Sequence, residues 1–111
     1  MLLRVFVAKR FLCSMHRNFA LLHQRQVYSA VCVSVHPVDT RGSYVMEITT
    51  LATDRRRRHF GLAGHLVNYL KEFAARLQCK SLVVTAIANG HVARGFWIAM
   101  GFKQGKYWKF S

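Results

Sequence analysis

Apolar and polar residues alternate through much of the first half of the chain. Residues 19–23 and 27–36 are separated by the polar residues 24–26, and the second run alternates valines with smaller or polar residues. This pattern predicts a β-hairpin. His36-Pro37 then interrupts the strand, residues 39–43 have the composition of a turn, and residues 44–53 predict a third antiparallel strand.

In the second half, the apolar residues change to a spacing of three or four positions. They are Leu62, Leu66, Tyr69, Leu70, Phe73 and Leu77. This spacing predicts an amphipathic helix that begins after Gly61. Residues 81–88 predict a buried strand, residues 91–100 a short helix that stops at Gly101, and residues 102–110 a final strand. The order of elements predicts an α/β domain with a mainly antiparallel sheet, in which one helix crosses over to a parallel neighbour.

Length and charge restrict the classes of protein. With 111 residues and 52% hydrophobic composition, the chain is expected to form one packed domain. Lysine and arginine number 17 against 4 acidic residues, a net charge of +13. Such a charge attracts nucleic acid, anionic lipid or a phosphorylated cofactor, and it disfavours a strongly cationic substrate unless a local acidic patch overrides it.

The N-terminal residues 1–18 mix basic residues with leucine, valine and phenylalanine, and the first acidic residue is Asp39. The pattern is typical of a mitochondrial targeting segment and equally of a basic first element of the fold. The three cysteines show no disulfide or zinc spacing, which favours a reducing, intracellular compartment: nucleus, cytoplasm or mitochondrion. We expect no metal site, and no uncharged stretch approaches the ~20 apolar residues that a membrane span requires.

The junction between the third strand and the first helix has the features of a phosphate-binding site. The first N–H groups of a helix have no partner within it, and the helix dipole places about half a positive charge there. A pyrophosphate fits such a site, where Arg58 would supply a charged contact, Gly61 a close backbone approach and Ala63 little bulk. Alternatively, the four arginines at 55–58 form a solvated charge run or a nucleic-acid patch.

Residues 58–63 resemble the Arg/Gln-x-x-Gly-x-Gly/Ala motif of the GNAT superfamily of acetyl-CoA-dependent N-acetyltransferases. The resemblance continues through residues 47–53 and 64–73, is closest to the histone lysine acetyltransferase branch, and includes a second segment at 93–102. It covers roughly residues 19–103. It implies a GNAT-like domain over residues 19–111, with a mixed, mainly antiparallel sheet, a crossover helix and a shortened N-terminal part, after a basic segment of residues 1–18.

The resemblance also implies the position of acetyl-CoA. The backbone of Leu51, Ala52 and Thr53 would pair with the pantetheine arm in the manner of an added strand. The pyrophosphate would be held by Arg58, His59, Phe60, Gly61, Leu62, Ala63 and Gly64. Phe96 and Trp97 would lie near the cofactor or in the core behind it.

Glu47 matches the position of the general base in the histone branch. A lysine amine has a pKa of about 10.4 in water, so attack on a thioester needs a base that removes its proton directly or through water. We expect Glu47 to share a strand face with Val45, Thr49, Leu51 and Thr53, in a mainly apolar setting. On the alternative interpretation, Glu47 is a surface carboxylate paired with an arginine.

The remaining catalytic role implied by the resemblance is stabilisation of the oxyanion, which falls to the backbone N–H of Leu51. Many family members have a tyrosine where this chain has Trp97, so no proton donor for the leaving thiolate is evident. The acceptor would be an amine, with a protein lysine as one candidate.

Two other functions are compatible with the same residues. The chain can be a small basic nucleic-acid-binding protein, in which residues 55–58 and a C-terminal group contact phosphates and bases. That group consists of Lys103, Lys106, Lys109, Tyr107 and Trp108. Alternatively, the chain is a GNAT relative that binds acyl-CoA without catalysis.

Overall fold

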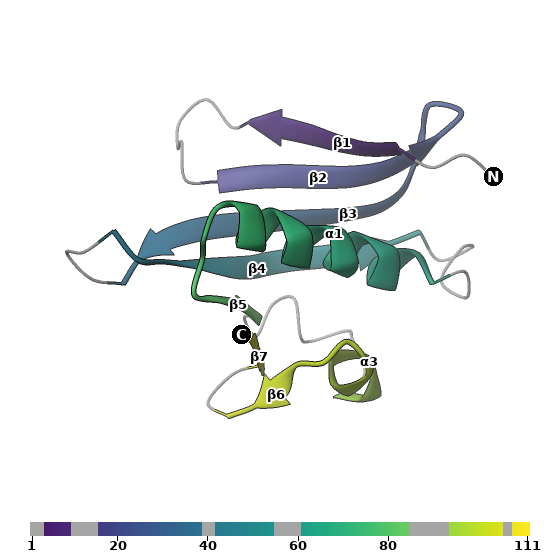
Figure 1. The fold of residues 1–111 in the computed structure, drawn as a ribbon. Helices are drawn as coiled ribbons and strands as arrows, with labels where there is room; N and C mark the ends of the chain where they lie inside the picture. The colour runs from purple at the N-terminus through teal and green to yellow at the C-terminus, as the bar shows by residue number, and fades with distance from the viewer. Residues whose placement is uncertain (1–3, 10–15, 39–41, 55–60, 85–93, 106–107) are drawn as a thin grey trace.

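The computed structural model describes residues 4–9, 16–38, 42–54, 61–84, 94–105 and 108–111. Two helices and seven strands lie within these ranges (Figure 1). In chain order they are β1 (Arg4–Lys9), β2 (His16–His23), β3 (Gln26–Pro37), β4 (Tyr44–Thr53), α1 (Leu62–Arg76), β5 (Ser81–Val84), α3 (Arg94–Ala99), β6 (Lys103–Gln104) and β7 (Trp108–Phe110).

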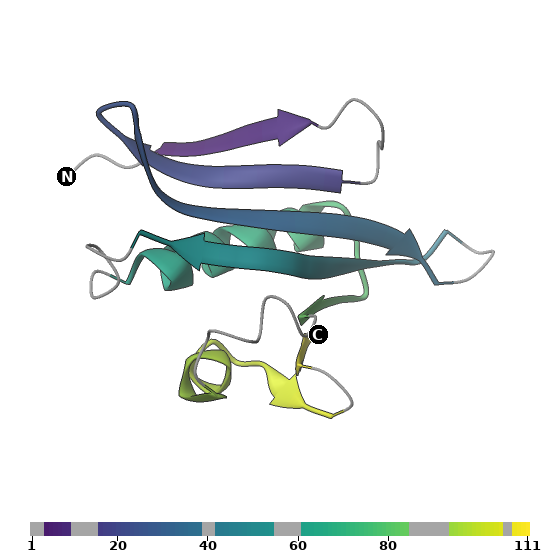
Figure 2. The ribbon, with the colours of Figure 1, turned by 180° about the vertical axis from the view of Figure 1, so that it is seen from behind.

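The seven strands form one sheet in the order β1-β2-β3-β4-β5-β7-β6. The first four pair antiparallel, β4 pairs with β5 in parallel, and β7 pairs antiparallel with both β5 and β6. Helix α1 makes the crossover between β4 and β5. It lies in front of β3 and β4 in Figure 1 and behind them in Figure 2, so it covers one face of the sheet.

The hydrophobic core lies between this face and the helices. Helix α1 buries Leu62, Leu66, Val67, Leu70 and Ala74. These side chains pack against buried residues of the strands, including Phe19, Val31, Val33, Met46, Ile48 and Leu82. The 3.6-residue repeat of the helix and the two-residue repeat of the strands thus face each other, as the sequence pattern predicts.

Helix α3 packs on the same face as α1. Its Trp97 has its ring centroid 5.0 Å from that of Phe102, which lies 5.6 Å from the ring of Phe110 on β7. Phe110 is opposite the buried Leu82, so this aromatic series belongs to the core face. No helix within the described part of the chain lies on the opposite surface of the sheet, which we call the outer face.

Most of the predicted elements are confirmed. The hairpin, the third strand, the long helix and the parallel strand lie where the periodicity places them, although the structure describes the parallel strand only to Val84 and the second helix only from Arg94. The predicted final strand over residues 102–110 is wrong in one respect, because two short strands, β6 and β7, replace it. The strand β1 extends the sheet into residues 4–9, and no helix among the described residues is long and apolar enough to cross a membrane.

One irregularity in β4 changes which residues face the core. Val33 is opposite Ile48, whereas the preceding residue, Cys32, is opposite Thr50, so Thr49 is an extra residue in β4. Such a β-bulge reverses the inward and outward alternation beyond it. The hydroxyl of Thr49 donates a hydrogen bond of 3.1 Å to the carbonyl oxygen of Cys32, which fixes the bulge.

Lys71 links α1 to the C-terminal part of the fold. Its ammonium group donates a hydrogen bond to the carbonyl oxygen of Met100, just after α3, and lies 4.3 Å from the ring centroid of Phe110. Desolvation by burial lowers the pKa of Lys71 below its ordinary value. The charged group therefore gives up part of its hydration for these contacts.

We expect Lys71→Ala to lower the free energy of unfolding by about 1–2 kcal/mol, since both a charged hydrogen bond and a cation–π contact are lost. Urea denaturation monitored by circular dichroism measures this change. Arg76→Ala, on the exposed end of the same helix, is the control and should change stability little. If Lys71→Ala and Arg76→Ala have the same effect, Lys71 does not join α1 to α3 and β7.

Candidate functional site

The edge of β4 changes its hydrogen-bonding partners along its length. Parallel pairing with β5 includes Val45 to Ile48, and its last described pair is Ile48 and Val84, where the described part of β5 also ends. Beyond this pair, β4 continues to Thr53 with β3 on one side. Within the described ranges, no strand pairs with the other side of this last segment.

The direction of the backbone groups in this segment follows from one hydrogen bond. The N–H of Asp54 donates to the carbonyl oxygen of Tyr28 on β3 at 2.8 Å. Because successive N–H groups of a strand point to alternate sides, the N–H of Ala52 also points to β3, whereas those of Leu51 and Thr53 point away from it. Leu51 and Thr53 therefore present main-chain donors and acceptors at the edge not occupied by β3.

Ala52 is directed differently from its two neighbours. Its carbonyl oxygen accepts a hydrogen bond of 3.0 Å from the hydroxyl of Ser29. A strand-like ligand along the far edge of β4 would therefore contact the backbone of Leu51 and Thr53 rather than that of Ala52.

The N-terminus of α1 lies at the same end of the sheet as the C-terminal end of β4 (Figures 1 and 2). Its N-cap is Gly61 in the left-handed conformation, with φ of 69°, and a glycine has no side chain that could cap the helix. The first turn contains no acidic residue. The first N–H groups of α1 and the helix dipole therefore place partial positive charge at this end, and the first turn does not offset it.

The predicted pyrophosphate residues fall into two groups. Gly61, Leu62, Ala63 and Gly64 form the N-cap and first turn of α1, with the side chain of Leu62 buried in the core. A Cβ atom added to Gly64 would have Sδ of Met100 as its nearest neighbour, at 3.5 Å, an ordinary contact. Arg58, His59 and Phe60, with the arginines at 55–57, lie outside the described residues.

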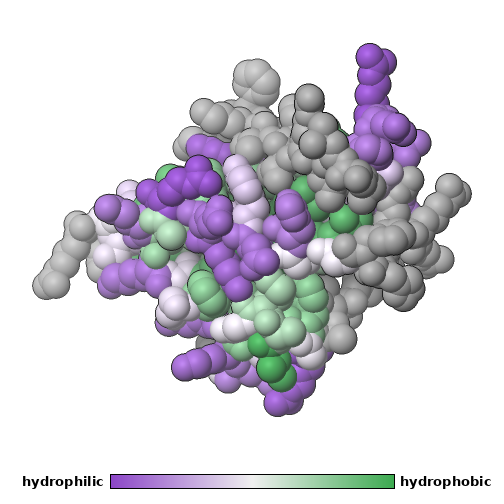
Figure 3. All heavy atoms as spheres, turned by 45° about the vertical axis from the view of Figure 1, so that its right-hand side comes forward, coloured by the Kyte–Doolittle hydropathy of each residue, from purple (hydrophilic) through white to green (hydrophobic). Residues whose placement is uncertain are grey.

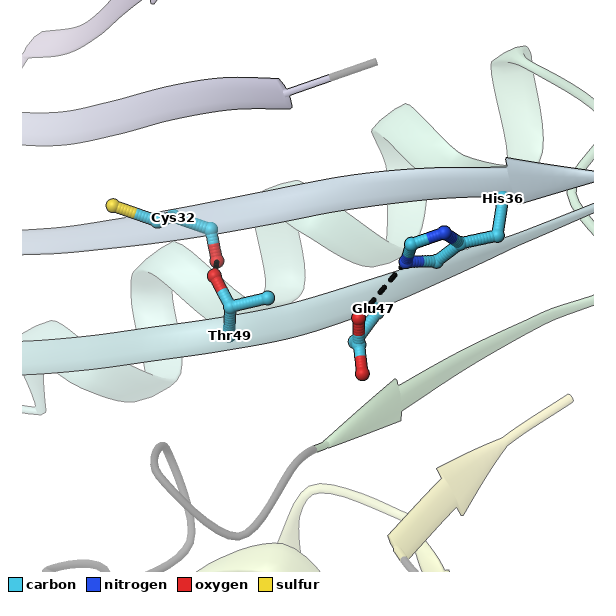
Figure 4. Close-up of polar contacts among 4 residues, drawn as sticks. All are labelled: Cys32, His36, Glu47 and Thr49. Atoms are coloured by element: carbon cyan, nitrogen blue, oxygen red, sulfur yellow. Dashed lines mark hydrogen bonds and ion pairs between the residues drawn. The ribbon is translucent and has the colours of Figure 1, made fainter. Parts of the chain in front are cut away.

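Glu47 lies on the outer face of β4, and its carboxylate is paired with a histidine. Its Oε1 atom is 2.9 Å from Nε2 of His36 on β3, and α1 lies behind both strands in Figure 4. The side chains of Glu47 and His36 are 28% and 54% exposed, respectively. The carboxylate is thus held in place and still accessible to a ligand.

The predicted surroundings of Glu47 require a correction. Leu51 is opposite Val31 and Ile48 is opposite Val33, and the two valines lie on the core face. Leu51 and Thr53 therefore lie on the core face, not on the face of Glu47. The bulge at Thr49 is the physical reason, because simple alternation takes no account of an extra residue.

The sequence does not predict His36 as the partner of Glu47, and the alternative interpretation of Glu47 named an arginine. The signal was present in the hairpin: Pro37 is opposite Tyr44, so His36 is opposite Val45 and lies diagonal to Glu47 on the same face. Diagonal neighbours on a sheet are within reach of long side chains. The register was the missing information.

The aromatic residues of the C-terminal half are mainly structural. Trp97 is fully buried and packs edge-on against Phe96, which is partly buried against the core. Trp108 is 3% exposed, so its ring is not available to stack on a base as the nucleic-acid interpretation requires. Lys106 and Tyr107 lie outside the described residues.

Comparisons with known proteins agree on the fold. The model of the Acetyltransferase (GNAT) family matches residues 15–102. A transcriptional regulator from Bacillus halodurans C-125 superposes with a TM-score of 0.74 at 20% identity, over 85% of this chain and 63% of that one. An acetyltransferase from Trypanosoma brucei gives 0.70 at 20% identity, over 82% and 64% of the two chains.

A third similar structure is an aminoglycoside acetyltransferase from an uncultured soil metagenomic sample. It has a TM-score of 0.62 and 19% identity, over 67% of this chain and 49% of that one. The chain thus spans between 49% and 64% of the length of these three structures. No curated protein matches the chain. The family match covers most of the sequence, and the sheet, crossover helix and topology agree with it: the chain belongs to the GNAT acetyltransferase family.

Proposed function

We propose that this protein binds acetyl-CoA along the free edge of β4 and at the N-terminus of α1, and transfers the acetyl group to an amine with Glu47 as general base. One observation carries the proposal: the main-chain groups of Leu51 and Thr53 point away from β3, at the end of β4 that precedes the positive N-terminus of α1. An extended amide-containing arm that ends in a pyrophosphate has the complementary arrangement of groups.

The residues present fit such a ligand. Leu51 and Thr53 offer donors and acceptors at strand spacing to the amides of the pantetheine arm. Gly61, Leu62, Ala63 and Gly64 offer the N–H groups of a helix N-terminus to the pyrophosphate, with Arg58, His59 and Phe60 before them in the sequence. Bound acetyl-CoA would supply a thioester carbonyl, the electrophile of the reaction.

The chain's own groups would then perform two tasks. The N–H of Leu51 would donate to the carbonyl oxygen as negative charge develops on it. Glu47 would remove the proton of the attacking amine, directly or through water. It lies four residues before Leu51, roughly 10–13 Å along the strand, so the amine and the thioester carbonyl would lie between the two residues. His36 would keep the carboxylate in one orientation by donating from Nε2.

The acceptor class is an amine. The resemblance to the histone lysine acetyltransferase branch supports a protein lysine, while three solved structures of similar fold are aminoglycoside acetyltransferases. A GNAT relative that binds acyl-CoA without catalysis would share the cofactor site and differ in the role of Glu47. The nucleic-acid alternative requires an exposed aromatic ring in the C-terminal group. Trp108, the aromatic residue of that group that the structure describes, is buried.

Replacing Gly61 with valine should abolish stabilisation by CoA. Gly61 has φ of 69°, where a residue with a side chain costs about 1–2 kcal/mol and a β-branched one more, so the first turn must move. A thermal shift assay with CoA measures the loss. The control is Gly64→Ala, which has room for its methyl group and should keep the shift. An unchanged shift for Gly61→Val would exclude the helix terminus as the pyrophosphate site.

Glu47→Gln should lower kcat by about 10²–10⁴ while the thermal shift with CoA is retained, because only proton removal from the amine is affected. A spectrophotometric assay of CoA release, with a panel of amines, measures kcat. Glu72→Gln, an exposed carboxylate of α1, should have no effect on kcat. Activity of Glu47→Gln within threefold of the unchanged protein would rule out the base assignment and leave the cofactor site standing.

His36→Ala should lower kcat about fivefold, as expected for the loss of a partly exposed polar partner worth about 1 kcal/mol. In the Glu47→Gln background the same substitution should have no further effect, because His36 acts through the carboxylate. A double-mutant cycle in kcat distinguishes this role from general destabilisation, which would lower both backgrounds equally.

A further inference from the structure

Glu47 belongs to a row of residues that crosses four strands on the outer face. Glu47 is opposite Val83 on β5, Val83 is opposite Lys109 on β7, and Lys109 is opposite Lys103 on β6. Directly opposed residues point to the same face of a sheet. Since neighbouring strands lie about 4.8 Å apart, Lys109 and Lys103 are roughly 10 and 15 Å from Glu47, measured between Cα atoms.

The two lysines form an unusual pair. Both are exposed, and like charges directly opposite each other destabilise a strand pair. Neither lysine forms an ion pair with another residue in the ranges that the structure describes. A cavity of about 150 Å³ lies beside them, lined by Gly101, Lys103, Lys109 and Ser111. Two unpaired ammonium groups at one cavity favour an anionic ligand.

The position of the pair relative to Glu47 suggests what the anion is attached to. Lys109 and Lys103 lie on the same face of the sheet as Glu47, so one ligand on that face can reach all three side chains. Along this row of opposed residues, they are the next charged residues that the structure describes. A net charge of +13 further disfavours a polycationic acceptor.

We propose that the acceptor is a primary amine that carries a carboxylate or phosphate about 10 Å from its nitrogen, and that Lys109 and Lys103 bind this anionic group. The proposal rests on the acetyl transfer proposed above, and it adds a specificity site formed by β6 and β7. A polycationic acceptor, such as a lysine flanked by other lysines, would be repelled from the same site.

The test compares matched amines. One series is an extended peptide with a single lysine and Glu, Gln or Arg three residues away, about 10 Å along the chain. The other is 8-aminooctanoate, 8-aminooctyl phosphate and octylamine, so that the two arms separate a peptide from a small molecule. In the peptide series, the aminoalkyl series or both, kcat/KM should be about five- to tenfold higher for the anionic amine than for the neutral one. The difference should come from a lower KM for the anionic amine.

Lys103→Gln combined with Lys109→Gln should reduce this preference to less than twofold and leave kcat/KM for the neutral amine unchanged. Arg76→Gln removes one charge from the other side of the molecule and should keep the preference. Equal rates for anionic and neutral amines, or a preference that survives the double substitution, would overturn the proposal while leaving acetyl transfer intact.

A binding measurement separates this outcome from failure of the proposed function. Titration with the Glu peptide should shift the amide NMR signals of Gly101 and Ser111, which line the cavity, in the unchanged protein and not in the double variant. Such shifts without acetylation of any amine would support the anion site and reject the transferase function. An absence of both the shifts and the preference would reject the anion site.

Discussion

The arrangement of the proposed site depends on the bulge in β4. The described parallel pairing of β4 with β5 runs to Ile48 and Val84, and the bulge at Thr49 follows immediately in β4. Continued pairing would place the main-chain groups of Leu51 and Thr53 inside the sheet, where no ligand can reach them. The bulge also turns the side chain of Leu51 into the core, while Glu47 stays on the outer face. The bulge at Thr49 thus allows the carboxylate of Glu47 to lie on the outer face while the main-chain groups of Leu51 and Thr53 lie at the edge of β4.

Much of the fold was predictable because it depends on periodicity. The alternation in residues 27–36 and the three- and four-residue spacing in residues 62–77 correspond to β3 and α1, since each face must bury its apolar side chains against the other. The left-handed conformation of Gly61 also agrees with its use as a helix boundary. Leu77 is the exception on the helix: it follows the last helical residue and is exposed.

Features that depend on register were not predictable from one sequence. The bulge at Thr49 leaves no signal in composition, so alternation assigned Leu51 and Thr53 to the wrong face. The contact between His36 and Glu47 requires knowledge of which residues of the hairpin are opposite, because sequence distance alone does not fix a diagonal pair. The pairing of Lys103 with Lys109 was hidden for the same reason, since residues 102–110 read as one strand.

The proposed site has two parts, and amino-acid substitutions affect them differently. The groups assigned to the cofactor are mainly main-chain N–H and carbonyl groups of β4 and α1, whose positions follow from the fold whatever the side chains are. The groups assigned to the acceptor, by contrast, are side chains of β3, β4, β6 and β7: His36, Glu47, Lys103 and Lys109. The fold persists at 19–20% identity in the similar structures. A site formed by main-chain groups depends on the fold more than on the side chains. Substitutions on the outer face change the charge that an acceptor meets without disturbing β4 or α1. On this scaffold, the chemistry of the acceptor can therefore change independently of the cofactor.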